Sequence, residues 1–198
     1  MNIEAIYLAA GFGSRFGSNK LLYELEGKAL YRYGLDMLSA AQKECVSISR
    51  ITVVTQYAEI ERYVEALPEN QAGHIRCAQN SHSERGISSS LQIGILADEG
   101  CQADAYLFCV ADAPYLSKET LLGMIKAFTE SEKGILCAKA AGQRGNPVIF
   151  DKKYRQELLA LTGDLGGRQI LLAHPGDIKE FLLKDLHELL DIDYSKKS

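Results

Sequence analysis

The sequence lacks the features that mark several specialised classes of protein. It has no tryptophan, only four prolines, and no stretch rich in Pro, Gly or Ser that would serve as a linker. No run approaches the roughly 18 apolar residues of a membrane span, so we expect no membrane association. Its five cysteines are scattered and form no C-x-x-C pair, which argues against a zinc site or a disulfide framework and favours a reducing compartment. The expected location is therefore the cytoplasm.

Positive charge is not in excess either. The chain has 22 Lys and Arg residues against 26 Asp and Glu residues, which gives a net charge of −4. Such a chain has no global field that would hold DNA or RNA, so we expect no nucleic-acid partner. The hydrophobic content of 46% and the length of 198 residues predict an ordinary globular protein with a single domain over residues 1–198.

What the sequence has instead is an alternation of short apolar runs with longer helical patterns. The runs are rich in apolar residues, as expected of strands covered on both faces, and span Ile3–Ala10, Ile51–Thr55, Ile75–Ala78, Ala105–Ala111, Ile135–Ala138 and Pro147–Phe150. Helical patterns follow Gly86 and Ser117, and two more cover 154–162 and 166–173. This alternation predicts an α/β fold with a mostly parallel sheet wrapped by helices. In such sheets, ligands bind at the carboxyl ends of the strands.

The first expected strand ends in a glycine-rich segment that suits an anion. It reads Leu8-Ala9-Ala10-Gly11-Phe12-Gly13-Ser14-Arg15-Phe16-Gly17-Ser18-Asn19-Lys20. The glycines free the backbone to bring N–H groups against phosphates, and Arg15 and Lys20 add positive charge. The spacing matches neither the dinucleotide pattern G-x-G-x-x-G nor the Walker pattern. A flexible surface turn is the alternative, but the two cations at the end of a strand favour phosphate binding.

A carboxylate ends another of the buried runs. Asp112 follows the expected strand Ala105–Ala111 and precedes Pro114 by two residues. A carboxylate there needs a partner, and Mg²⁺ takes one or two protein carboxylates together with phosphate oxygens. The alternative is an Asp that caps the turn before Pro114. Asp191 and Asp193 form a second acidic pair, which would share one face if that segment is a strand and would otherwise simply be solvated.

A serine run opens the helical pattern that follows Gly86. It comprises Ser88, Ser89 and Ser90. At a helix start, hydroxyls and free N–H groups can contact the edge of a nucleobase, and a simple helix cap is the alternative.

Six segments match, in order, the motifs of one enzyme family. Residues 8–20 match L-A-A-G-x-S-x-R-M-G-x-x-K, with Gly13 in place of Ser and Phe16 in place of Met. The later matches are Glu84–Ile95 at G-x-x-S-S-L-x-x-G, Ala111–Pro114 at D-x-P, Arg144–Pro147 at R-G-N-P, Gly163–Arg168 at G-D-x-G-x-R, and Leu190–Asp193 at D-I-D. Over almost its whole length, the chain therefore resembles the molybdenum cofactor cytidylyltransferases of the MobA-like NTP transferase superfamily.

This resemblance implies a three-layer α/β/α Rossmann-like nucleotidyltransferase fold with a mostly parallel mixed sheet. It implies Mg²⁺-dependent transfer from CTP to molybdenum-bearing molybdopterin, which gives the cytosine dinucleotide cofactor and pyrophosphate. The product serves hydroxylases of the xanthine dehydrogenase type, so a molybdenum hydroxylase apoenzyme is an expected partner.

The family motifs assign roles to single residues of this sequence. The catalytic residues are Arg15, Lys20 and Asp112, and the metal ligands are Asp112 and Asp193. Nucleotide binding is assigned to Leu8, Ala9, Ala10, Gly11, Gly13, Ser14, Arg15, Lys20, Ser89 and Ser90. Acceptor binding is assigned to Arg144, Asn146, Asp164 and Arg168.

Two features of the motifs bear on the choice of substrate and on activity. Ala9-Ala10-Gly11 favours the cytidylyltransferases over the guanylyltransferases, whose first motif usually reads L-A-G-G. After Asp193 the sequence reads Tyr-Ser-Lys-Lys-Ser, where the family pattern continues T-P-E-D. The alternatives are a guanylyltransferase, a transferase for a sugar phosphate or similar acceptor, and a non-catalytic carrier of the cofactor, which the different tail would suit.

Overall fold

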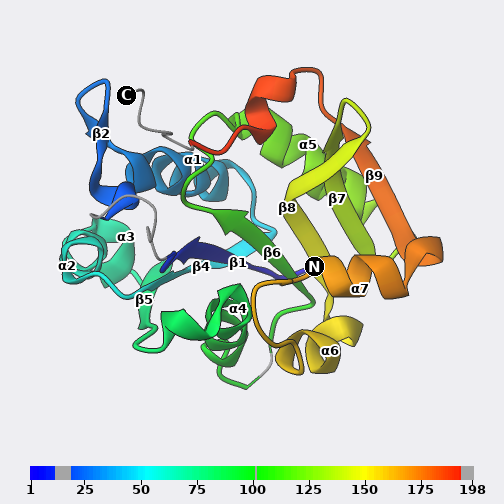
Figure 1. The fold of residues 1–198 in the computed structure, drawn as a ribbon, viewed down its shortest axis with the longest axis horizontal. Coiled ribbons are helices and arrows are strands. Elements are labelled where there is room, and N and C mark those ends of the chain that lie inside the picture. Colours follow the sequence, from blue (N-terminus) through cyan, green and yellow to red (C-terminus); the bar gives the residue numbers. More distant parts are fainter. Residues whose placement is uncertain (12–18, 101, 193–198) are drawn as a thin grey trace.

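The computed structural model describes residues 1–11, 19–100 and 102–192, and within them helices cover both faces of a seven-stranded sheet (Figure 1). The strands of this sheet are β1 (Ile3–Ala9), β4 (Ile48–Thr55), β5 (Ile75–Gln79), β6 (Ala105–Val110), β7 (Ile135–Ala140), β8 (Gln143–Asp151) and β9 (Ile178–Leu182). The helices are α1 (Leu30–Glu44), α2 (Ala58–Glu65), α3 (Pro68–Gln71), α4 (Ile87–Leu96), α5 (Lys118–Thr129), α6 (Arg155–Leu159) and α7 (Arg168–Ala173). Two short strands, β2 (Glu24–Leu25) and β3 (Lys28–Ala29), form a separate hairpin before α1.

One strand of the sheet runs against the others. The strand order is β5-β4-β1-β6-β8-β7-β9, and every pairing is parallel except those of β8 with β6 and β7. Phe108 of β6 lies opposite Val148 of β8, so the residues that precede Val148 continue toward the edge where β6 ends. The carboxyl ends of β1, β4 and β6 therefore share one edge of the sheet with the first residues of β8.

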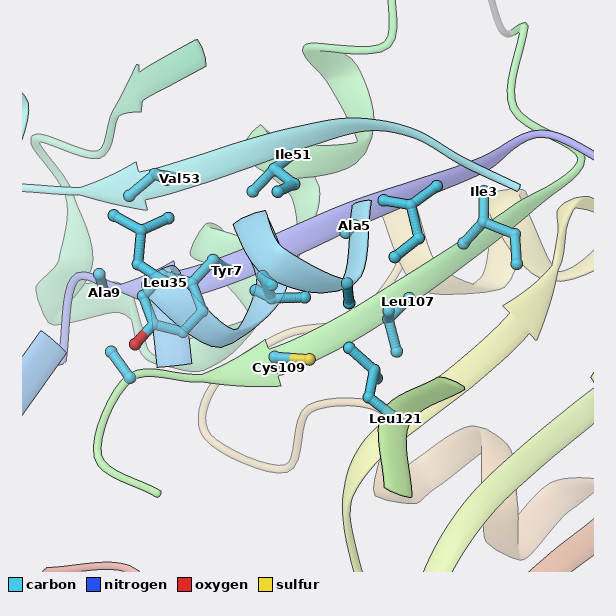
Figure 2. Close-up of a cluster of buried hydrophobic side chains, with 14 of the residues drawn as sticks. Ile3, Ala5, Tyr7, Ala9, Leu35, Ile51, Val53, Leu107, Cys109 and Leu121 are labelled. Atoms are coloured by element: carbon cyan, nitrogen blue, oxygen red, sulfur yellow. The ribbon is translucent and has the colours of Figure 1, made fainter. Parts of the chain in front are cut away.

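Alternate side chains of the strands enter two separate cores, because helices cover both faces of the sheet. On β1, Ile3 and Tyr7 point into the core beneath α1, α2 and α5, where Figure 2 shows them with Leu35 of α1. Ile6 and Leu8 belong to the opposite core, which α4, α6 and α7 cover. Strand β1 is thus buried on both faces up to the point where the glycine-rich segment begins.

Two glycines let helices approach β1 closely from opposite sides. A Cβ on Gly34 of α1 would lie 2.7 Å from Oη of Tyr7, and a Cβ on Gly94 of α4 would collide with Ile6. Tyr7 is fully buried, and its hydroxyl donates to the carbonyl oxygen of Tyr31 at 2.6 Å. Close contact on both faces fixes β1, and with it the starting point of the glycine-rich segment.

The predicted α/β fold, with a mostly parallel mixed sheet between two helical layers, is confirmed. Every expected strand is present, although β8 already begins at Gln143 rather than at Pro147. The sequence patterns did not predict α1, α2 or β9, and the expected helix over 154–162 ends at Leu159. Residues 190–192 are irregular, so the possibility that Asp191 lies on a strand is wrong. Among the described helices, none has the length and apolar character that crossing a membrane requires.

Candidate active site

Lys20 and Asp112 meet at the carboxyl edge of the sheet although they are far apart in the sequence. Lys20 begins a short 3₁₀ helix, whose N-cap Asn19 accepts a hydrogen bond from the N–H of Leu21 at 3.0 Å. Asp112 lies two residues beyond the end of β6. Nζ of Lys20 is 3.1 Å from Oδ2 of Asp112, and the two side chains are 12% and 33% exposed. An ammonium group and a partly exposed carboxylate are thus held together just beyond β6.

The described part of the glycine-rich segment leaves space beside its backbone. Leu8, Ala9 and Ala10 are buried, whereas Gly11 is exposed. A Cβ on Gly11 would meet no atom of the described residues within 4 Å, and the φ of Gly11 lies outside the left-handed region. Nothing in the described part of the chain requires glycine here, and the missing side chain leaves this backbone accessible to a ligand. The other predicted residues of this segment, Gly13, Ser14 and Arg15, lie outside the described residues.

The backbone of Asp112 is fixed by the C-terminal segment. The N–H of Ile192 donates to the carbonyl oxygen of Asp112 at 2.9 Å. Earlier in that segment, Oε1 of Glu188 accepts from the N–H of Ser117 at 3.0 Å, which ties the segment to the start of α5. Asp193 lies outside the described residues, and within them no three His, Cys, Asp or Glu side chains gather as metal ligands. Asp112 offers the carboxylate oxygens that Mg²⁺ prefers, and the metal site stays a prediction.

Ser89 and Ser90 are buried at the start of α4 and bound by one amide. Nδ2 of Asn80, a fully buried side chain, donates to Oγ of each serine at 2.9 Å. Oγ of Ser89 also donates to the carbonyl oxygen of Gly86 at 2.8 Å. These bonds fix both hydroxyls, whose contact with a nucleotide stays a prediction. The sequence patterns did not identify Asn80. The feature that could have pointed to it is a polar residue directly after the strand β5.

The N–H groups at the start of α4 are already used within the chain. The N–H of Ile87 donates to Oδ1 of Asp164 at 3.2 Å, and the N–H of Ser88 donates to the carbonyl oxygen of Gly163 at 3.1 Å. The expectation that a free N–H group of the serine run contacts a nucleobase is therefore wrong for Ser88. The carboxylate of Asp164 instead caps α4, where negative charge is favourable, and joins this helix to the loop before α7.

A cavity of about 830 Å³ collects all four residues that were predicted to bind the acceptor. Arg144 and Asn146 enter its lining from β8, Asp164 from the loop before α7, and Arg168 from α7 itself. The apolar part of the lining, which includes two aromatic rings, comprises Leu8, Ile87, Leu91, Phe108, Val148, Phe150, Leu165, Leu171 and Leu172. A cavity of this size, with a few polar groups around apolar side chains, suits a small organic ligand.

Two further charged residues of this cavity, Lys139 and Glu180, were missed from sequence. Oε2 of Glu180 lies 2.6 Å from Nζ of Lys139, and Oε1 of Glu180 lies 2.8 Å from Nη2 of Arg144. Hydrogen bonds from Lys139 and then Arg144 lower the pKa of Glu180. Glu180 therefore stays ionised at neutral pH and holds two cations side by side in the cavity lining.

Comparison with known proteins identifies relatives of the whole chain. The model of the MobA-like NTP transferase domain matches residues 5–178. The purine catabolism protein PucB of Bacillus subtilis (strain 168) is 27% identical over 95% of this chain and 90% of its own length. A molybdenum cofactor guanylyltransferase of Shewanella sp. (strain ANA-3) is 28% identical over 76% of this chain and 68% of its own length.

A solved structure shares the fold. Rv0371c of Mycobacterium tuberculosis H37Rv has a TM-score of 0.77 and 22% identity, with 98% of this chain and 94% of that chain covered. Its complex with manganese has a TM-score of 0.73 and 18% identity, with 92% and 89% covered. Because the matched domain spans most of the sequence, the chain belongs to the MobA-like NTP transferase family.

Proposed function

We propose that this nucleotidyltransferase transfers CMP from CTP to the phosphate of molybdenum-bearing molybdopterin and releases pyrophosphate. The observation that carries the proposal is the Lys20–Asp112 pair at the same sheet edge as Arg144 and Asn146 of the cavity lining. The residues proposed for the triphosphate and those proposed for the anionic acceptor thus lie at one sheet edge. The product would serve hydroxylases of the xanthine dehydrogenase type, and a relative named for purine catabolism supports this because xanthine is a purine.

The cavity has the chemistry that a pterin phosphate needs. Its apolar lining, with the rings of Phe108 and Phe150, offers surface for a flat ring system. Arg144 and Arg168 supply guanidinium groups that match phosphate geometry, and Asn146 supplies an amide for a ring edge. The predicted acceptor residues therefore line a cavity that offers partners for both a ring and a phosphate.

The reaction needs position and positive charge more than a strong base. An oxygen of the acceptor phosphate attacks the α-phosphorus of CTP, and the bond from that phosphorus to the bridging oxygen of pyrophosphate breaks. The acceptor phosphate is largely ionised near neutral pH because its second pKa is about 6. Lys20, with Arg15 and the N–H groups near Gly11, would stabilise the charge that develops on the departing pyrophosphate.

A divalent cation would add to this positive charge. Mg²⁺ would neutralise charge on the phosphates, and Asp112 and Asp193 are the residues proposed to hold it. The position of Asp112 beside Lys20 supports this role, as does the manganese complex of Rv0371c, a protein of the same fold. The chain's own contribution is to keep the carboxylate partly exposed and to hold the backbone of Asp112 in place through the hydrogen bond from Ile192 to its carbonyl oxygen.

CTP and GTP are both candidates for the nucleotide donor. Ala9-Ala10-Gly11 supports CTP, whereas the Shewanella relative, a molybdenum cofactor guanylyltransferase, supports GTP. The second candidate function is therefore guanylyl transfer to the same acceptor. The two functions share the phosphate chemistry and differ only in the base.

Pyrophosphate release with Mg²⁺ and molybdenum cofactor tests the proposal, with CTP, GTP, ATP and UTP compared in parallel. Release with CTP alone is the expected result. Release with GTP alone would establish the second candidate. No release by folded protein with intact cofactor would refute both and would favour another acceptor or a carrier without chemistry.

A further inference from the structure

Three consecutive carbonyl oxygens at the end of β1 are each bound by a side chain from the end of β4. The donors follow one another in sequence, and the bonds are Thr55 Oγ1 to Ala9 O at 3.0 Å, Gln56 Nε2 to Ala10 O at 2.9 Å, and Tyr57 Oη to Gly11 O at 2.7 Å. Backbone pairing of the two strands ends at Ala9 and Thr55. Side chains therefore continue the contact between the strands into the start of the glycine-rich segment.

These bonds determine which way the N–H groups of the segment face. In a planar trans peptide, the N–H of one residue points opposite to the carbonyl of the residue before it. The carbonyl of Ala10 points to the side of β4, so the N–H of Gly11 points to the side of β6. Strand β6 is the other neighbour of β1, and it leads to Asp112 and its partner Lys20. A phosphate oxygen at that side would meet the N–H of Gly11 and not the carbonyl oxygen of Ala10.

The hydroxyl of Tyr57 is itself held in place. The N–H of Tyr57 donates to Oγ1 of Thr55 at 3.1 Å, and the ring packs against the core beneath α1 and α2. Nε2 of Gln56 donates to Oη of Tyr57 at 3.2 Å, which leaves the hydroxyl hydrogen for Gly11. Burial raises the pKa of Tyr57 above its ordinary value, so the hydroxyl remains a donor at neutral pH.

We infer that Gln56 and Tyr57 are positioning residues for the triphosphate, an inference that rests on the proposed function. They hold the carbonyls of Ala10 and Gly11 turned away from the phosphates, and they act only through this backbone. A neutral hydrogen bond of this kind corresponds to an affinity change of about 2- to 10-fold. Its loss should weaken binding of the triphosphate and leave binding of the acceptor unchanged.

The test compares four proteins by calorimetry with CTP and with pyrophosphate, each in the presence of Mg²⁺. They are the wild type, Tyr57→Phe, Gln56→Leu and the control Tyr33→Phe. Oη of Tyr33 donates to the carbonyl oxygen of Leu25 at 2.6 Å, so the control removes an equivalent bond away from β1. We expect Tyr57→Phe and Gln56→Leu each to bind both ligands about 2- to 10-fold more weakly, with Tyr33→Phe like the wild type.

Steady-state kinetics and melting temperatures complete the design. The KM for CTP should rise in Tyr57→Phe while the KM for the acceptor and the melting temperature stay near wild type. Wild-type affinity in Tyr57→Phe would overturn the inference and leave the proposed function standing. An equal loss in Tyr33→Phe would also overturn it, because the effect would then be general. A folded wild type that binds neither CTP nor pyrophosphate would overturn the proposed function, and this inference with it.

Discussion

Asp112 has its side chain and its backbone held by different partners. Oδ2 accepts a hydrogen bond from Lys20 at 3.1 Å, and the carbonyl oxygen accepts one from the N–H of Ile192 at 2.9 Å. Asparagine has nearly the same shape and keeps an oxygen that can accept from Lys20. A change to asparagine therefore removes the negative charge at this position and keeps the local structure.

Asp112→Asn is expected to lower metal-dependent pyrophosphate release at least about a hundredfold, because a neutral amide binds Mg²⁺ more weakly than a carboxylate and the reacting phosphates lose the positive charge that the ion would supply. Its melting temperature should stay near wild type. The matched control is Asp104→Asn, since Asp104 also lies 3.1 Å from a lysine, Lys152, but at the start of β6. Turnover is measured at saturating CTP and acceptor. Equal turnover in the two variants would contradict the role of Asp112.

The position of a residue relative to an apolar run decides whether sequence reveals it. Asp112 stands just beyond one apolar run and Lys20 ends the glycine-rich segment that follows another, so the sequence alone predicts that both lie at one sheet edge. Lys139 and Glu180 have no such mark. They meet because β7 and β9 pair in parallel with Cys137 opposite Glu180, and that register is a property of the folded sheet. Their place in the cavity could not be predicted from sequence.

Among the elements, α4 depends on a glycine to meet the loop before α7. Gly86 has φ +90, and a Cβ there would lie 2.5 Å from the backbone carbon of Gly163 and 2.5 Å from Oδ1 of Asp164. The side chain of Asp164 can move, but the backbone of Gly163 cannot move without breaking its bonds to Ser88. Gly86 thus lets the cap of α4 and one wall of the cavity form together.

Gly86→Ala is expected to lower the free energy of unfolding by roughly 3 kcal/mol, through backbone strain and collision combined. Gly73→Ala is the matched control, because Gly73 has φ +75 and a Cβ there would meet nothing within 4 Å. That change should cost only the strain, roughly 1 kcal/mol. Urea denaturation measures both. Equal losses would show that the contact with Gly163 carries no energetic weight.

Elements that sequence patterns missed have weak boundaries or half-exposed faces. Helix α1 starts at Leu30 after Ala29, which makes no side-chain cap bond, so no capping residue marks its beginning. Strand β9 includes Lys179 and Glu180 and ends at Leu182, which is 72% exposed. A search for continuous apolar runs finds strands buried on both faces and passes over an edge strand of this kind.

Across the whole molecule, the direction of β8 brings the cavity residues Arg144 and Asn146 to the sheet edge that holds Lys20 and Asp112. The hairpin between β7 and β8 turns at Ala141 and Gly142, which have φ values of 48 and 81. Two positive φ values in a two-residue loop are those of a tight hairpin turn. The expected strands stop at Ala138 and resume at Pro147, so sequence shows two strands but neither the turn nor the reversal. The shared edge therefore follows from topology.

The acid stability of the molecule should depend on Asp177, which joins the beginnings of β7 and β9 to the segment after β8. Its carboxylate accepts from Lys153, Tyr154 and the N–H of Gly134. Burial would raise the pKa of Asp177, but these bonds outweigh it and lower the pKa to about 2 from 3.8. A lowered pKa in the folded state means that the ionised group stabilises the fold above the unfolded pKa. That stabilisation is lost as the pH falls from about 4 toward 2.

Asp177→Asn should therefore be less stable than wild type at pH 7, because asparagine cannot form the ion pair with Lys153. The difference should shrink as the pH falls from about 4 to about 2, since the wild-type carboxyl group becomes neutral over that window. Urea denaturation of both proteins at a series of pH values measures this difference directly. If the difference in the free energy of unfolding stayed constant down to pH 2, the role of ionised Asp177 would be contradicted, because effects of shape and packing do not depend on pH.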